Sequence, residues 1–121
     1  MGNHILLIDC NGSPSRKMLQ AGIDFMKLNT ILITHAYTDH VYGLPILMHE
    51  MMLRGGAKSV AIFCPEPVLK TLNTLLDCYL AQESSFPLIN LNPVKMERNV
   101  LVMAADDYEV SSTAIDHGVP T

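Results

Sequence analysis

The stretch that most constrains the fold is residues 31–45, where an apolar run ends in a cluster of polar side chains. The run is rich in β-branched residues, which favours a strand, and a glycine-containing stretch after the cluster leads into a helical pattern. His35, Asp39 and His40 belong to this one connection. Imidazole nitrogens and carboxylate oxygens are the usual ligands of catalytic zinc, so the spacing predicts a metal site. From these residues alone, a strand-to-helix turn with two incidental histidines is an equally good interpretation.

The segment resembles the H-x-H-x-D-H signature of the metallo-β-lactamase superfamily, with His35, Asp39 and His40 at matching positions. The approach to His35 and the Gly-Leu-Pro at residues 43–45 are also similar to those of the superfamily. One position departs from the signature, because Tyr37 stands where the family has its second histidine. A phenol that keeps its proton is a poor zinc ligand at neutral pH. The resemblance therefore implies the fold more firmly than the full metal site.

Length and composition fit one globular domain. The chain has 121 residues, of which 49% are hydrophobic, and this is enough for one core but too short for two ordinary domains. The apolar stretches are interrupted well before about 20 residues, so we expect no transmembrane helix. The first residues lack a basic region followed by an uninterrupted apolar run, so we expect no signal peptide and a cytoplasmic location.

Cysteines and charge narrow the kinds of site that the chain can form. The three cysteines are far apart, without a C-x-x-C pair, at Cys10, Cys64 and Cys78. This argues against a disulfide framework and a cysteine zinc site, and we expect the thiols to be reduced and mostly buried. The net charge is −4, and the basic residues are scattered. Binding of nucleic acid by phosphate neutralisation is therefore weakly supported.

Apolar runs bounded by turn residues predict six strands. They cover residues 4–8, 28–34, 59–64, 88–91, 100–104 and 108–115. A loop is expected at residues 84–87, and a solvated turn at Asp106 and Asp107. Strands that alternate with helices predict an α/β domain in which helices pack on a mixed sheet.

Three helices are predicted between the strands. The first begins at Ser13 and Pro14 and ends at Gly22, with Met18 and Leu19 turned inward. The second ends at a Gly-Gly pair, and its apolar stripe is interpreted as core packing by Leu44, Leu47, Met48, Met51 and Met52. The third begins at a Glu-Pro pair and has one apolar face, formed by Val68, Leu69, Leu72, Leu75, Leu76, Tyr79 and Leu80. Two histidines are expected at the surface, namely His4 and His49.

A second polar segment closes the sequence at residues 114–121, where a predicted strand runs into His117. One histidine near a terminus is usually just exposed. The segment is nevertheless similar to the H-G-V-P segment of the ribonuclease Z branch of the superfamily, whose histidine is a ligand of the first metal. This resemblance implies that His35 and His117 would bind one metal, while Asp39 and His40 would begin the site for a second.

The resemblance also implies a function. A ribonuclease Z-like enzyme would use one or two zinc ions to hydrolyse a phosphodiester, such as the 3′ trailer of a tRNA precursor. Asp39 would orient the attacking water or take up its proton, and Asp9, which matches part of the family's D-C-G, would lie close to the metal loop. Each metal keeps two protein ligands here, whereas catalytic zinc usually has three. Water, Tyr37, another chain or a missing half would have to complete the shell.

Two further interpretations stay open. The resemblance covers the front half of the superfamily fold, so we expect an incomplete domain that binds an RNA substrate, a second copy of the chain or a missing partner half, and no membrane. A non-catalytic remnant that serves as a binding or assembly module would leave apolar sheet surface for such a partner. The last interpretation is an α/β domain of unrelated function with chance histidines.

Overall fold

The computed structural model describes residues 4–55, 59–80, 89–119 and 121. Its centre is a parallel sheet with the strand order β1-β2-β3-β4, formed by β1 (Leu6–Ile8), β2 (Thr30–Leu32), β3 (Val60–Pro65) and β4 (Ile89–Val94). An antiparallel pair follows, formed by β5 (Val100–Ala104) and β6 (Glu109–Ser112). The predicted α/β class and all six predicted strands are confirmed, with the parallel and antiparallel pairings divided between two sheets.

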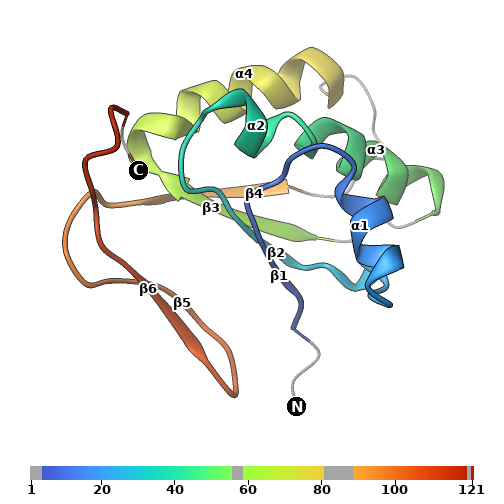
Figure 1. Cartoon of the computed structure of the whole chain (residues 1–121), viewed down its shortest axis with the longest axis horizontal. Coiled ribbons are helices and arrows are strands. Elements are labelled where there is room, and N and C mark those ends of the chain that lie inside the picture. The colour runs from blue at the N-terminus through green and yellow to red at the C-terminus, as the bar shows by residue number, and fades with distance from the viewer. Residues whose placement is uncertain (1–3, 56–58, 81–88, 120) are drawn as a thin grey trace.

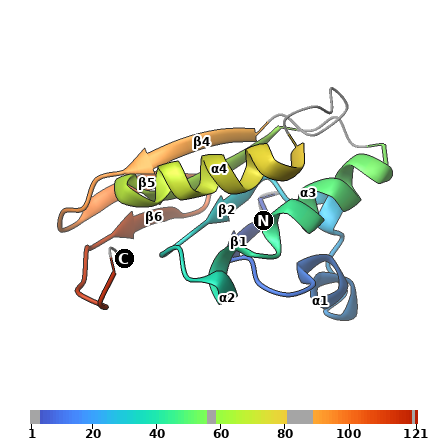
Figure 2. The same cartoon turned by 90° about the horizontal axis from the view of Figure 1, so that it is seen from above.

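Helical segments connect the parallel strands, as parallel pairing requires. They are α1 (Pro14–Gln20), the 3-10 turn η1 (Phe25–Lys27), α2 (Thr38–Val41), α3 (Leu44–Leu53), the 3-10 turn η2 (Glu66–Val68) and α4 (Leu69–Leu80). Helices α3 and α4 lie on one side of the sheet, and the β5–β6 hairpin lies on the other (Figure 1). Seen from above, α3 and α4 run next to each other (Figure 2). No described helix has the length and apolar character that crossing a membrane requires.

The hydrophobic core fills the space between the parallel sheet and its helices. Strand β3 alternates, with Val60, Ile62 and Cys64 buried on the helix side and Ala61 and Phe63 half-buried on the other. The largest side chains without solvent contact are Phe25, Leu28, Ile31, Leu44, Leu47, Met48, Met51, Ile62 and Leu72. The apolar stripe of α3 is therefore core packing, as predicted, except that Met52 is only half-buried.

Helix α1 ends as the glycine predicted. Gly22 has a φ of +75°, the left-handed conformation that glycine adopts without a Cβ clash. The amide of Ile23 donates to the Met18 carbonyl at 2.8 Å and the amide of Gly22 donates to Leu19 at 3.0 Å, so two carbonyls of the last turn are satisfied. Met18 is buried as predicted, but Leu19 is 50% exposed. The prediction for Leu19 was wrong because the next residue along a helix points about 100° away.

Helix α4 follows the η2 turn and has the predicted amphipathic character. Val68, Leu72 and Leu76 are buried. Tyr79 is 68% exposed, although it was predicted on the same apolar face. The side chain of Leu80, the predicted loop at residues 84–87, and the second glycine after α3 lie outside the described residues.

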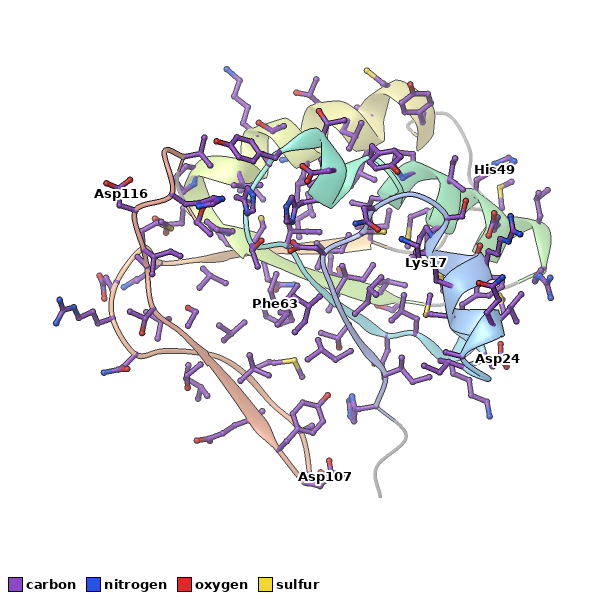
Figure 3. The ribbon with its side chains drawn as sticks, in the orientation of Figure 1. Lys17, Asp24, His49, Phe63, Asp107 and Asp116 are labelled. Atoms are coloured by element: carbon purple, nitrogen blue, oxygen red, sulfur yellow. The ribbon has the colours of Figure 1, made fainter. Side chains whose placement is uncertain are left out.

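The remaining surface predictions are confirmed. Asp106 and Asp107 are exposed in the turn between β5 and β6, at the tip of the hairpin in Figure 3. His4 and His49 are exposed as well.

Candidate metal centre

The candidate site lies at the carboxyl end of β2, where the chain turns into α2 and α3. His35 follows this strand, and α2 contains Asp39 and His40. The segment after β6 returns to the same side of the molecule (Figure 1). Ligand sites at the carboxyl ends of parallel strands are a general property of α/β folds.

Three histidine rings form one cluster. The ring centroid of His35 is 4.0 Å from that of His40 and 5.1 Å from that of His117. His35 is 5% exposed, so it lies beneath the other two. The end of the chain therefore returns to the turn after β2, which is the proximity that a shared metal site needs. The assignment of these histidines as metal ligands stays a prediction.

Asp9 connects the turn after β1 to this cluster. Its backbone has a φ of +57°, a left-handed conformation that aspartate tolerates better than most residues. Its Oδ1 accepts from the Thr34 amide at 2.8 Å, and both carboxylate oxygens lie within reach of the Thr34 hydroxyl, at 3.0 and 2.9 Å. Its Oδ2 lies 2.8 Å from Nδ1 of His40. The carboxylate therefore fixes His40 and Thr34 at once.

The two ring nitrogens of His35 have different surroundings. Nδ1 lies 2.9 Å from the Thr34 hydroxyl oxygen. Nε2 is buried and has no hydrogen-bond partner among the residues that the structure describes. A buried polar atom without a partner costs about 1–3 kcal/mol, and such atoms often mark a place for a ligand.

The electrostatics favour an uncharged His35. Burial lowers the pKa of its imidazole, and the nearby His40 lowers it further. Removal of a charge from water is unfavourable, and a second imidazolium close by is repelled. His35 is therefore neutral at neutral pH and can offer a lone pair to a metal, as ligation requires.

Tyr37 stands beside the cluster. The residue is 43% exposed, and its ring meets that of His35 edge-on, with centroids 4.8 Å apart, while the centroid of the His117 ring lies 6.0 Å away. The phenol thus occupies the neighbourhood where the superfamily signature has an imidazole. Its hydroxyl oxygen lies near Gly118: a Cβ added to that glycine would be 3.8 Å from this oxygen.

Asp39 is the outermost member of the site. Its side chain is 76% exposed, and its Oδ2 lies 3.5 Å from Nε2 of His40, whose side chain is 29% exposed. This distance exceeds that of a good N–H···O hydrogen bond. Asp39 is therefore able to reorient toward a ligand or solvent.

The described residues fit a metal only in part. No group of three or more His, Cys, Asp or Glu side chains in this part of the chain is arranged for ion binding. The best candidate donor is Nε2 of His35, which is buried and has no partner among the described residues, and the rings of His40 and His117 lie beside it. A closed zinc shell needs four ligands, so water or further donors would have to complete it.

Sequence reasoning missed the roles of two residues that support the site. Thr34 was taken only as a strand residue, although a hydroxyl immediately before His35 was a usable signal. Gly43 lies against the backbone of the turn after β1, where a Cβ would be 2.9 Å from the Gly12 carbonyl oxygen and 3.1 Å from that of Cys10. A close approach of two backbone segments leaves no mark in hydrophobic periodicity.

The three cysteines differ in exposure and in the pKa of the thiol. Cys10 and Cys64 are buried, whereas Cys78 is exposed, and all three are free thiols. Burial, with a smaller effect of Asp9, raises the pKa of Cys10 to about 12, and burial raises that of Cys64 to about 11. Both buried thiols therefore stay protonated and unreactive.

Comparison with known sequences gives a family. A family model described as anti-Pycsar protein Apyc1 matches residues 1–117. A ribonuclease Z of Methanococcus maripaludis is 31% identical over 116 residues, which cover 96% of this chain and 37% of the relative. A ribonuclease Z of Methanothermobacter thermautotrophicus is 34% identical over 118 residues, which cover 95% of this chain and 36% of the relative. The chain thus spans little more than a third of the length of these relatives.

Comparison with solved structures gives the fold. Human tRNase Z, short form, superposes with a TM-score of 0.76 at 16% identity, over 99% of this chain and 51% of the other. The metallo-β-lactamase fold protein YhfI from Bacillus subtilis superposes with a TM-score of 0.62 at 17% identity, over 99% of this chain and 46% of the other. The expectation of an incomplete metallo-β-lactamase-like domain is therefore confirmed. The chain belongs to the family described as anti-Pycsar protein Apyc1, and it has part of a metallo-β-lactamase fold.

Proposed function

We propose that this chain forms part of a zinc-dependent hydrolase that cleaves phosphodiester bonds. The observation that carries the proposal is the cluster of His35, His40 and His117, in which the buried Nε2 of His35 has no partner among the described residues. A neutral imidazole with an available lone pair is a favoured zinc ligand. The ribonuclease Z relatives support a phosphodiester as the bond that is cleaved.

Each site residue has a proposed role. His35 and His117 would hold one zinc, and Asp39 with His40 would begin a site for a second. A zinc ion, when bound, would lower the pKa of water and polarise a phosphoryl oxygen. Asp39 would accept a proton at its carboxylate, which is open to solvent. Asp9 would hold His40 in place through its 2.8 Å contact with Nδ1.

We further propose that the substrate is RNA, and specifically the 3′ trailer of a tRNA precursor. The names of the ribonuclease Z relatives and of the human tRNase Z structure support RNA, and tRNA in particular, as the substrate. The net charge of −4 means that basic side chains of this chain would contribute little to RNA affinity. Contacts between the metal site and the scissile phosphate would therefore carry most of the binding by this chain.

The test combines metal content and activity. We would measure zinc by elemental analysis, and hydrolysis of bis-p-nitrophenyl phosphate and of a tRNA precursor, for the chain and its His35→Ala variant. We expect bound zinc that is lost in the variant, with any hydrolysis lost in parallel. His49→Ala, at an exposed position of α3 (Figure 3), is the matched control. Zinc well below one ion per chain, with no hydrolysis of either substrate, would contradict the proposal.

A second candidate role is a non-catalytic assembly module. A cavity of about 370 Å³ lies between the parallel sheet and the β5–β6 hairpin, and its lining includes Ile8, Leu32, Phe63, Val102 and Val110. Phe63 points from β3 into this region (Figure 3), and Ile8 is 60% exposed. Exposed apolar sheet surface favours association. In this role a second copy of the chain would cover the exposed apolar surface on the hairpin side of the parallel sheet.

Sedimentation separates the two roles. The assembly role predicts a dimer. Ile8→Ser in β1 should convert this dimer to monomer, whereas Leu53→Ser, at an exposed apolar position on α3, should leave the dimer intact. A well-folded monomer at high concentration would exclude this role.

We assign the chain to the cytoplasm. Its three free thiols support this assignment, because extracytoplasmic compartments favour disulfides. Microscopy of a fluorescent fusion would test it, and a periplasmic or secreted signal would contradict it.

A further inference from the structure

We infer that Thr34 is a positioning residue whose hydroxyl sets which ring nitrogen of His35 carries the proton. In this arrangement His35 is protonated at Nδ1 and presents the lone pair of Nε2 to the histidine cluster. The tautomer is a property of the metal-free chain. Its consequence for zinc binding rests on the proposed function.

The hydrogen-bond inventory around Thr34 leads to this assignment. An ionised carboxylate only accepts, and a threonine hydroxyl has one proton to donate. The Thr34 oxygen lies 3.0 and 2.9 Å from the two oxygens of Asp9 and 2.9 Å from Nδ1 of His35. If the hydroxyl donated to His35, its lone pairs would face two carboxylate oxygens at hydrogen-bond distance with no proton between them. The hydroxyl therefore donates to Asp9, and His35 must donate from Nδ1 to the hydroxyl oxygen.

The same carboxylate orders His40. Because Oδ2 of Asp9 lies 2.8 Å from Nδ1 of His40, Nδ1 of that ring also carries a proton. The Thr34 amide is the third donor, at 2.8 Å from Oδ1. A carboxylate has about four lone-pair sites, so it can accept all three donors. One acceptor therefore gives both imidazoles the same tautomer, one directly and the other through Thr34.

The consequence appears at Nε2 of His35. The alternative tautomer would place the lone pair against Thr34 and a proton on Nε2, where no acceptor is present among the described residues. It would leave two polar groups unsatisfied in a buried position, which is costly. The Thr34 hydroxyl thus keeps Nε2 ready to bind a ligand before any ligand arrives. This is the general role of groups that orient histidine ligands.

The test is ¹⁵N NMR of histidine-labelled chain in the presence of a chelator, at a pH of about 8, where histidine is ordinarily neutral. Correlations between ring carbon-bound protons and both ring nitrogens distinguish the tautomers directly. We expect His35 protonated at Nδ1 in the wild type and in Thr34→Ser, which keeps the hydroxyl. Thr34→Val, which removes it at similar shape, should shift His35 toward the Nε2-protonated form. Thr74→Val removes a hydroxyl that bonds locally within α4 and should leave His35 unchanged.

A second variant keeps the inference testable if Thr34→Val does not fold. In Asp9→Asn, the amide oxygen can still accept from the Thr34 amide, but the amide nitrogen must donate toward Thr34 and His40. His40 should then change to the Nε2-protonated form. An Nε2-protonated His35 in the wild type, or unchanged tautomers in folded Thr34→Val or Asp9→Asn, would overturn the inference.

Zinc titration then separates the inference from the proposed function. If the wild type binds zinc, Thr34→Val should bind it about 10-fold to 100-fold more weakly, as for other groups that orient ligands, while Thr34→Ser should bind as the wild type does. If the wild type binds no zinc but the tautomers change as expected, the role of Thr34 is supported and the proposed hydrolase is not. Equal zinc affinity in Thr34→Val and the wild type would contradict the consequence for the metal.

Discussion

Asp9 and His40 are in contact through their side chains, and the backbone next to Asp9 is hydrogen-bonded to that of His40. The carboxylate lies 2.8 Å from Nδ1 of the imidazole. The next residue, Cys10, donates its amide to the His40 carbonyl at 2.7 Å and accepts from the Gly43 amide at 3.0 Å. The turn after β1 and the connection from α2 to α3 therefore form one unit. A change in either segment should alter the geometry of both.

Gly43→Ala should destabilise the fold and disturb the site. The added Cβ would be 2.9 Å from the Gly12 carbonyl oxygen and 3.0 Å from the Asn11 carbonyl carbon, and backbone atoms cannot move aside as flexible side chains do. We expect a loss of about 1–3 kcal/mol in the free energy of unfolding, which is typical of overpacking. Urea denaturation measures this loss.

The matched control is Ser13→Ala, at the residue before α1. Its side chain makes no capping hydrogen bond, so the free energy of unfolding should change by less than about 0.5 kcal/mol. If Gly43→Ala costs no more than this control, the close packing of the two segments is not important for stability.

Tyr37→His should increase zinc affinity. The ring centroid of Tyr37 lies 4.8 Å from that of His35 and 6.0 Å from that of His117. An imidazole at position 37 could therefore supply the donor that the signature contains. We expect an increase of at least about tenfold, because a third protein ligand completes the usual catalytic set. Competition with a chromophoric chelator measures it.

Tyr42→His controls for the added imidazole. Tyr42 is 48% exposed and follows α2 directly, but it makes no ring contact with the histidine cluster among the described residues. If both variants bind zinc equally, the location of Tyr37 has no special importance for the site.

The thiols should differ in reactivity. Cys78 is exposed, whereas Cys10 and Cys64 are buried, with pKa values raised to about 12 and about 11 by burial. A thiol reagent at a pH of about 8 should therefore modify one cysteine quickly and the other two only after unfolding. Mass spectrometry counts the labels. Rapid labelling that persists in Cys78→Ser would show that a buried thiol is accessible in the native state.

The sequence predicted the parts of the molecule that depend on local pattern. The apolar run at residues 59–64 predicted β3, and the stripe from Leu44 to Met51 predicted the buried face of α3. Leu19 was assigned wrongly because it directly follows the buried Met18 and therefore points about 100° away from it.

The candidate site was predictable only in part, for a different reason. His35, Asp39 and His40 are close in sequence, so their spacing was informative. The ring centroids of His117 and His35 lie 5.1 Å apart. This approach depends on the whole path of the chain, and only a family resemblance suggested it. Thr34 was overlooked because a threonine in a strand is ordinary, and its importance arises from the distant Asp9.

The stability of the metal-free chain should depend on pH through His35. Burial and the neighbouring His40 lower the pKa of this imidazole below its ordinary value of 6.5. Below that value, the unfolded chain binds a proton that the folded chain resists, so the unfolded state binds more protons and stability decreases as pH falls. The contribution of His35 is fully present above about 6.5. We expect the free energy of unfolding, measured with urea and chelator, to be smaller at about pH 5.5 than at about pH 7.5. His35→Asn, whose amide can still donate to Thr34, should make this difference smaller, whereas His49→Asn at the exposed position of α3 should preserve it. An equal pH dependence in the wild type and His35→Asn would show that His35 is no harder to protonate in the folded state than in the unfolded chain.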